Sequence, residues 1–220
     1  MHICPHIQEN NLNSVKNVYI RNPKMTDNCV NYFSNATELT IQYRPQICDD
    51  ALVTNVDRII PLEQLTKLVL HVRNFSFDEF IKLLCLTPNL HTLKFFVLSL
   101  DKTSSKLIQK SRTFQYVSKA NKITNLELLN WCTTLEEIKL IFKLFLQIEY
   151  LKISIDKKEI EQIIRFLFSK PNNKIYHLFS ICISRLPKRC LKELKTLIES
   201  ENLLDDYFIK FAHHDLYLWW

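Results

Sequence analysis

The stretch LTKLVLHVRNFSFDEFIKLLCLTPNLHTLKF, residues 65–95, decides the fold because it holds one complete strand-helix-strand unit. Its two ends, LTKLVL and LHTLKF, carry apolar residues at their first, fourth and sixth positions. Apolar and polar residues that alternate in this way predict half-buried strands. Between the ends, residues 76–86 open with Ser76 and Glu79, the spacing of a capping box, and continue with apolar residues at helical spacing. We therefore expect a strand, a helix and a second strand.

The same six-residue pattern recurs along most of the chain. Copies begin at Val15, Ala36, Leu65, Leu90, Ile123, Ile148 and, in an ambiguous copy, Leu178. Successive copies start 21, 29, 25, 33, 25 and 30 residues apart. Leucine-rich repeats are about 20–29 residues long, and each is a short strand followed by a helix or a 3₁₀ segment. The spacing predicts an α/β, leucine-rich-repeat-like solenoid of six or seven irregular strand-helix repeats with a parallel concave sheet.

Helices are expected between the later copies. The expected segments are residues 134–146, 156–169 and 187–201. The second opens with a cap-like pair, Asp156 and Glu159, and the third has Pro187 where a first helical residue is expected. Alternating strands and helices let each unit bury an apolar face against the next unit. The alternative is an irregular α/β domain with parallel strands.

The expected layout is an N-terminal extension, residues 1–14, followed by a leucine-rich-repeat domain, residues 15–220. Residues 99–122 are a polar insertion, for which we expect a loop with a short helix or an extra strand. Residues 203–220 are expected to cap the last repeat, because the open end of a solenoid must be covered. The apolar residues 216–220 then form a terminal strand, and the alternative is an exposed hydrophobic docking tail.

The chain contains no glycine among its 220 residues. P-loops and dinucleotide-binding fingerprints need glycine for close backbone approach and for positive φ, and nucleophile elbows carry flanking glycines. These enzyme classes are therefore excluded, and no cofactor is expected. His213, His214 and Asp215 are interpreted as a turn and not as a metal site, because adjacent histidines in a strand point to opposite faces. We expect a binding protein and not an enzyme.

The seven cysteines include no Cys-x-x-Cys pair, and we interpret them as reduced thiols packed as small hydrophobic residues. The N-terminal sequence MHICPHIQENNLNS has neither the basic region nor the apolar region of a signal peptide. Uninterrupted apolar runs of about 18 residues, which a membrane-spanning helix needs, do not occur. We therefore expect a cytoplasmic or nuclear protein with no membrane span.

The residues between the apolar positions of each copy should point away from the core, because successive strand side chains alternate between faces. A solenoid would present them together on its concave sheet. The candidate binding residues are Tyr19, Arg21, Thr40, Gln42, Lys67, His71, Lys94, Phe96, Glu127, Tyr150 and Lys152. Aromatic side chains and cations of this kind dominate many protein interfaces, so we expect a protein partner on the concave face. The alternative is that these are only solvated strand positions.

Two segments look most like a known family: TLEEIKLIFKLFLQIEYLKI at 134–153 and LPKRCLKELKTLIESENLLDDYFIKFAHHDLYLWW at 186–220. They resemble the C-terminal half of divergent F-box-like repeat proteins, and the pattern over residues 15–220 resembles the leucine-rich-repeat portion of F-box proteins. The resemblance implies substrate recognition for a cullin-type ubiquitin ligase. The F-box itself has no counterpart here, because the repeats begin by Val15. We expect either the C-terminal part of a longer protein or a chain that has lost ligase attachment, so adaptor binding is assigned to no residue.

Three other functions are weighed against this expectation. One is a ubiquitin-independent adaptor, which would use the same concave face. A second is nucleic-acid binding, because the formal net charge is +6, although the basic residues are scattered over helix faces. The third is an undetected hydrolase or transferase built around His71 or His91 with Lys94 nearby, for which the sequence shows no nucleophile or carboxylate partner.

Overall fold

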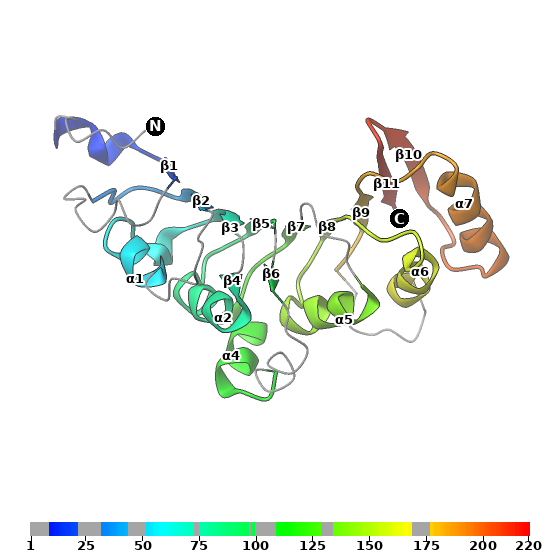
Figure 1. Cartoon of the computed structure of the whole chain (residues 1–220), viewed down its shortest axis with the longest axis horizontal. Coiled ribbons are helices and arrows are strands. Elements are labelled where there is room, and N and C mark those ends of the chain that lie inside the picture. Colours follow the sequence, from blue (N-terminus) through cyan, green and yellow to red (C-terminus); the bar gives the residue numbers. More distant parts are fainter. Residues whose placement is uncertain are drawn as a thin grey trace. The chain divides into compact units, whose positions relative to one another are not determined.

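The computed structural model describes residues 9–21, 32–43, 52–72, 75–96, 98–99, 109–128, 134–168 and 177–220. Within these ranges the fold is α/β with mostly parallel strands, as expected (Figure 1). The chain divides into two compact units, residues 1–123 and 124–220, and each unit is described by itself below.

The larger sheet has four parallel strands among the described residues of the first unit, and they are hydrogen-bonded in chain order. They are β1 (Asn17–Ile20), β2 (Glu38–Tyr43), β3 (Lys67–Val72) and β5 (Thr92–Phe95). Each strand begins two residues after the start of a predicted copy, and the four copies pair in matching register, with Val18, Leu39, Leu68 and Leu93 in one buried row. The regular register follows from the pattern, because a shift by one residue would expose every apolar side chain.

Helices and short elements complete this unit. They are η1 (Glu9–Ser14), α1 (Leu52–Asp57), η3 (Leu62–Gln64), α2 (Phe77–Leu86) and α4 (Arg112–Ala120), together with a two-stranded parallel ladder of β4 (Phe75–Ser76) and β6 (Leu98–Ser99). Helices α1, α2 and α4 lie on the same side of the unit's strands (Figure 1). Phe80 of α2 packs against Phe95 of β5, with ring centroids 5.3 Å apart, so the core lies between helices and strands. The predicted insertion, residues 99–122, thus contains the short helix α4, whereas β6 ends at the first residue of the insertion, Ser99. Residues 100–108 of the insertion lie outside the described residues.

The second unit contains three parallel strands followed by a terminal hairpin. The strands are β7 (Asn125–Leu128), β8 (Tyr150–Ile153), β9 (Ser180–Ile183), β10 (Phe208–Ala212) and β11 (Asp215–Trp219). The helices are α5 (Leu135–Leu144), α6 (Ile160–Phe168) and α7 (Cys190–Ser200). The strand order is β7-β8-β9-β11-β10, with β11 antiparallel to β9 and β10 antiparallel to β11. The ambiguous copy that begins at Leu178 therefore does contain a strand, β9. Residues 215–219 form the expected terminal strand.

The apolar positions of the predicted copies are buried, with one exception. Val15 is half-buried, whereas the later positions of its copy, Val18 and Ile20, are buried like those of every other copy. The polar positions between them are half-buried or exposed in β1, β3, β5, β7 and β8. In β9 both sets are buried, so side chains cover this strand on both faces.

The helix caps differ from those expected. Ser76 accepts a hydrogen bond from the Glu79 backbone N–H, but the Glu79 carboxylate binds Lys82 and not the Ser76 backbone, so only half of the predicted box forms. A complete capping box that the sequence analysis did not identify joins Thr134 and Glu137 at the start of α5. The capping box predicted at Ser76 is incomplete because Lys82 binds the Glu79 carboxylate. The complete box lies at Thr134, at the start of a different helix.

Two predicted helix starts are wrong by three to four residues. Asp156 accepts a hydrogen bond from the Lys158 N–H and holds a turn, so α6 begins only at Ile160. The Glu159 carboxylate instead accepts the N–H of Leu135, the first residue of α5. Pro187 lies before α7, whose first residue, Cys190, donates its N–H to the Pro187 carbonyl.

The expected turn at His213 and His214 is present between β10 and β11. Both residues have positive φ, 52° and 68°, which suits a two-residue hairpin turn. None of the helices in the described part of the chain combines the length and the apolarity needed to cross a bilayer. Of the cysteines, Cys85, Cys182 and Cys190 are described, and all three are free thiols; the other four lie outside the described residues.

Candidate functional site

The strand face opposite the α-helices of the first unit gathers eight of the eleven candidate residues. Parallel register aligns Tyr19, Thr40 and Lys94 in one row with Val69, and it pairs Gln42 with His71. Lys67 lies in a third row with Glu38 and Thr92. Arg21 and Phe96 directly follow β1 and β5. These side chains are exposed or half-buried, so they form one surface.

Neighbouring strands hold several of these side chains in place. The Tyr19 hydroxyl donates a hydrogen bond to Oε1 of Gln42. The Arg21 guanidinium lies 5.8 Å from the centre of the Tyr19 ring, within the range of a cation–π contact. Lys67 Nζ lies 2.8 Å from Oε2 of Glu38. Because the Tyr19–Gln42 and Lys67–Glu38 contacts join adjacent strands, the surface is ordered before any partner binds.

His71 and Phe96 form an aromatic pair on the same face. Their ring centroids are 3.9 Å apart, and the ring planes are tilted by 36°. Burial lowers the pKa of His71 below its ordinary value of 6.5. The imidazole is therefore neutral at pH 7 and contributes a flat, uncharged surface.

His71 does not approach His91, although the two histidines lie in neighbouring copies of the repeat. The β3–β5 register pairs Lys67 with Thr92, so His71 lies level with Phe96 and not with His91. The His91 N–H instead donates to the carbonyl of Thr66, at the other end of β3. About five residues at roughly 3.3 Å each separate the two histidines along the strands.

The same face of the second unit holds the remaining candidates, Glu127, Tyr150 and Lys152. One row across its strands contains Asn125, Tyr150, Ser180, Trp219 and Phe208. A second row contains Glu127, Lys152, Cys182, Tyr217 and Lys210. The repeat pattern indicated the first strands of each row, but the antiparallel hairpin adds residues that it did not indicate.

Asp215 is one of these added residues and organises the centre of the second unit's face. Its Oδ2 lies 2.8 Å from Lys152 Nζ and 3.8 Å from the Cys182 sulfur, and its Oδ1 accepts the Arg185 N–H. Burial tends to raise the pKa of Asp215, but the hydrogen bonds from Lys152 and Arg185 outweigh it and lower the pKa. Burial also opposes the charge of Lys152, yet the Asp215 hydrogen bond and nearby negative groups raise its pKa. Both residues are therefore ionised at pH 7.

Cys182 lies beneath this ion pair and is fully buried. Burial raises the pKa of its thiol, and the attraction of Lys152 does not overcome that effect. A nucleophilic cysteine needs a depressed pKa and access to solvent, so Cys182 is a packed thiol. Burial, together with neighbouring Cys182 and Glu127, also raises the pKa of Tyr150, which keeps this phenol protonated.

An aromatic group lies beside the ion pair, and the sequence analysis did not assign it to the site. Tyr217 and Trp219 stack with centroids 5.7 Å apart and planes 10° apart. Phe208 lies 5.6 Å from Trp219 and is 63% exposed. The alternation in DLYLW at 215–219 was the signal, because it places Asp215, Tyr217 and Trp219 on one face of a strand.

Among the described residues, no cluster of three or more His, Cys, Asp or Glu side chains could hold a metal ion. Comparison of the chain with protein-family models, with curated proteins and with solved structures finds no match. Function is therefore inferred from the repeat pattern and from the two strand faces described above.

Proposed function

We propose that this chain is a non-enzymatic protein-binding module of the leucine-rich-repeat type, which binds a protein partner through the strand face opposite its helices. The observation that carries the proposal is the composition of that face. In each unit, register places aromatic, cationic and polar side chains side by side, whereas the apolar positions of the same strands are buried.

The repeat part of the proposal rests on register as well as on spacing. Strands from four successive copies of the first unit pair without any offset, from Asn17 through Glu38 and Lys67 to Thr92. Such pairing is expected when each copy contributes one strand and one helical segment, and when each copy contacts only its neighbours. A solenoid of this kind would place one short strip from every copy on a common binding surface.

Several side chains of the strand face are ordered before a partner binds, which favours tight binding. A few aromatic or arginine side chains carry most of the free energy of a protein interface, and each contributes about 2 kcal/mol or more when it is buried at the centre. Side chains that are already held lose less conformational entropy when the partner arrives. Tyr19, held by Gln42 and Arg21, meets both conditions in the first unit. Trp219, stacked on Tyr217, meets them in the second.

The resemblance to F-box proteins supports a more specific role, substrate recognition for a ubiquitin ligase in the cytoplasm or nucleus. Affinity capture of the tagged chain from a nuclease-treated eukaryotic lysate tests this role. Recovery of a cullin and its adaptor would support it. Recovery of protein partners without ligase subunits would support a ubiquitin-independent adaptor in its place. Material that disappears with nuclease treatment would show that the chain binds nucleic acid.

Matched variants test whether the strand face is the binding surface. Tyr19→Ala combined with Phe96→Ala removes aromatic area from the first unit's face, and Trp219→Ala does so in the second unit. Tyr116→Ala is the control, because this tyrosine of α4 is 60% exposed and lies on a helix. We expect captured partners to be lost with a face variant and kept with the control. Equal capture by all variants, with unchanged unfolding temperatures, would exclude the strand face.

A further inference from the structure

Strand β10 is the edge of the second unit's sheet. It is last in the strand order and pairs only with β11 among the described strands. Its hairpin has a two-residue turn, His213 and His214, so Ala212 and Asp215 are the first pair of the ladder. In an antiparallel hairpin, residues that hydrogen-bond to the partner strand alternate with residues whose N–H and C=O point away. Backbone hydrogen bonds to β11 are thus expected from Ala212, Lys210 and Phe208. The backbone N–H and C=O groups of Ile209 and Phe211 point to the open edge.

This edge is long enough and apolar enough to accept another strand. Five residues are in extended conformation, and none of them is buried. Natural proteins usually protect such an edge with proline, a bulge or a charged side chain. In β10 the protecting group is Lys210, at the centre of the strand and opposite Tyr217.

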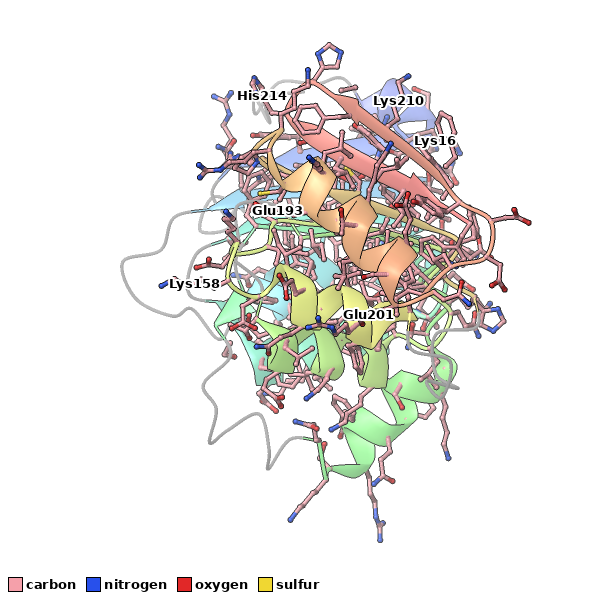
Figure 2. All side chains as sticks on the ribbon, turned by 90° about the vertical axis from the view of Figure 1, so that its right-hand side faces the viewer. Lys16, Lys158, Glu193, Glu201, Lys210 and His214 are labelled. Atoms are coloured by element: carbon pink, nitrogen blue, oxygen red, sulfur yellow. The ribbon has the colours of Figure 1, made fainter. Side chains whose placement is uncertain are left out.

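Lys210 argues against pairing between two copies of this chain. Each copy has four outward backbone groups, the N–H and C=O of Ile209 and of Phe211. The antiparallel register that pairs all of them places Ile209 of one copy opposite Phe211 of the other. That register places the two Lys210 side chains directly opposite each other, and like charges at opposed positions destabilise a strand pair. No carboxylate among the described residues forms an ion pair with Lys210, so its charge is available to a partner. Figure 2 labels Lys210 on the terminal hairpin, with His214 at the turn.

We infer that β10 binds an extended segment of a partner protein as an additional antiparallel strand, with an acidic residue of that segment opposite Lys210. Main-chain bonds to Ile209 and Phe211 supply the affinity, and side-chain pairing supplies the specificity. The residues on either side of the acid lie opposite Ile209 and Phe211, so they are apolar. The residue opposite Phe208 is aromatic or apolar, because Phe208 and Trp219 form an apolar surface there.

This inference goes beyond the strand-face proposal, because it uses the backbone groups of an edge. The probe is a labelled, end-blocked peptide with the central sequence Thr-Val-Glu-Val-Tyr, in which Glu lies opposite Lys210 and Tyr opposite Phe208. We expect it to bind the full chain, with amide NMR shifts concentrated at Ile209 and Phe211 and a change in Trp219 fluorescence. The matched Thr-Val-Lys-Val-Tyr peptide should bind about tenfold more weakly, because attraction becomes repulsion.

Two variants separate edge pairing from general adhesion. Lys210→Glu should reverse the preference between the two peptides, a result that a misfolded chain would not give. Ile209→Pro removes an outward N–H and should abolish peptide binding while the hairpin persists, whereas Lys210→Pro removes a hairpin bond and should lower the unfolding temperature.

Equal affinity for both peptides, or unchanged binding by Ile209→Pro, would overturn the inference. Concentration-dependent dimers of the unmodified chain in sedimentation, abolished by Ile209→Pro, would also overturn it in favour of a second copy. Loss of lysate partners with Tyr19→Ala and Phe96→Ala, but not with Ile209→Pro, would leave the strand-face proposal standing alone.

Discussion

Lys152 and Asp215 form an ion pair of 2.8 Å across three strands, although 63 residues separate them in sequence. Lys152 belongs to β8, Asp215 belongs to β11, and β9 lies between the two strands. Their side chains are only 22% and 18% exposed, so solvent screens the pair less than a typical surface ion pair. The pair fixes the terminal hairpin against the parallel strands of the second unit.

Removing one partner should destabilise the second unit by about 1–2 kcal/mol, between the values for exposed and for fully buried pairs. Lys152→Met leaves Asp215 charged and half-buried, and Asp215→Asn leaves Lys152 in the same state. The double variant should lose less free energy of unfolding than the two single variants lose together, because neither charge is then left half-buried without its partner. Urea unfolding of the four proteins measures this coupling. Strict additivity would show that the pair contributes nothing.

The lowered pKa of Asp215 predicts an acid-sensitive contribution to stability. Since the folded-state pKa lies below the unfolded value of about 3.9, the unfolded state binds the proton first as the pH falls. The contribution is complete above the unfolded pKa and is lost as the pH falls through the folded pKa. Urea unfolding between pH 6 and pH 2 should show a smaller acid loss for Asp215→Asn than for the unmodified chain. If stability fell equally with pH in the two proteins, the prediction would be contradicted.

His71 predicts a second, milder pH dependence in the first unit. Burial lowers its pKa, so below the ordinary value of 6.5 the unfolded state takes up the proton more readily. Stability from the neutral ring is therefore present above pH 6.5 and declines as the pH falls below it. His71→Phe keeps the contact with Phe96 and should remove this decline. NMR titration of the unmodified chain should give His71 a pKa below its ordinary value, and an unshifted value would contradict the prediction.

The capping box of α5 predicts a local loss of stability. Thr134→Ala removes the side chain that accepts the Glu137 N–H, and N-cap substitutions of this kind cost about 1 kcal/mol. Thr113→Ala is the control, because Thr113 is exposed in α4 and its replacement by alanine favours the helix. Thermal unfolding should separate the two variants. If Thr113→Ala lowered the unfolding temperature as much as Thr134→Ala does, the cap would have no special role.

The strands could be predicted from the sequence because burial and period agree at most copies. Leu68 and Leu93 are fully buried where the pattern put them, and Lys67 and Lys94 lie between buried positions. Helix α1 was missed because its six residues, Leu52–Asp57, are too few to show a helical period. Residues 134–146 were predicted to be helical, but the capping box that starts α5 was not identified, although Thr134 and Glu137 have its spacing.

Half of the candidate site in the second unit could not be predicted from the repeat pattern. Tyr150 and Lys152 belong to a copy of the repeat pattern. Asp215 and Tyr217 belong to the terminal hairpin, which does not contain the pattern and whose strand β11 pairs with β9. The partner of Lys152 depends on the register of an antiparallel strand 63 residues away. Sequence spacing contains no information about that register; only the packing of Leu216 and Leu218, both fully buried, determines it.

The turn of the terminal hairpin predicts a variant that is more stable than the chain itself. His213 and His214 both have positive φ, a conformation that costs a residue with a side chain about 1 kcal/mol, and the chain has no glycine to relieve it. Asn-Gly is the preferred pair for a two-residue turn of this kind. His213→Asn with His214→Gly should therefore raise the free energy of unfolding by about 1 kcal/mol, since glycine's greater freedom in the unfolded state offsets part of the gain. His213→Val is the opposing control and should destabilise the hairpin, because a β-branched residue fits poorly at positive φ. Urea unfolding compares the three proteins, and equal stabilities would mean that the turn is not strained.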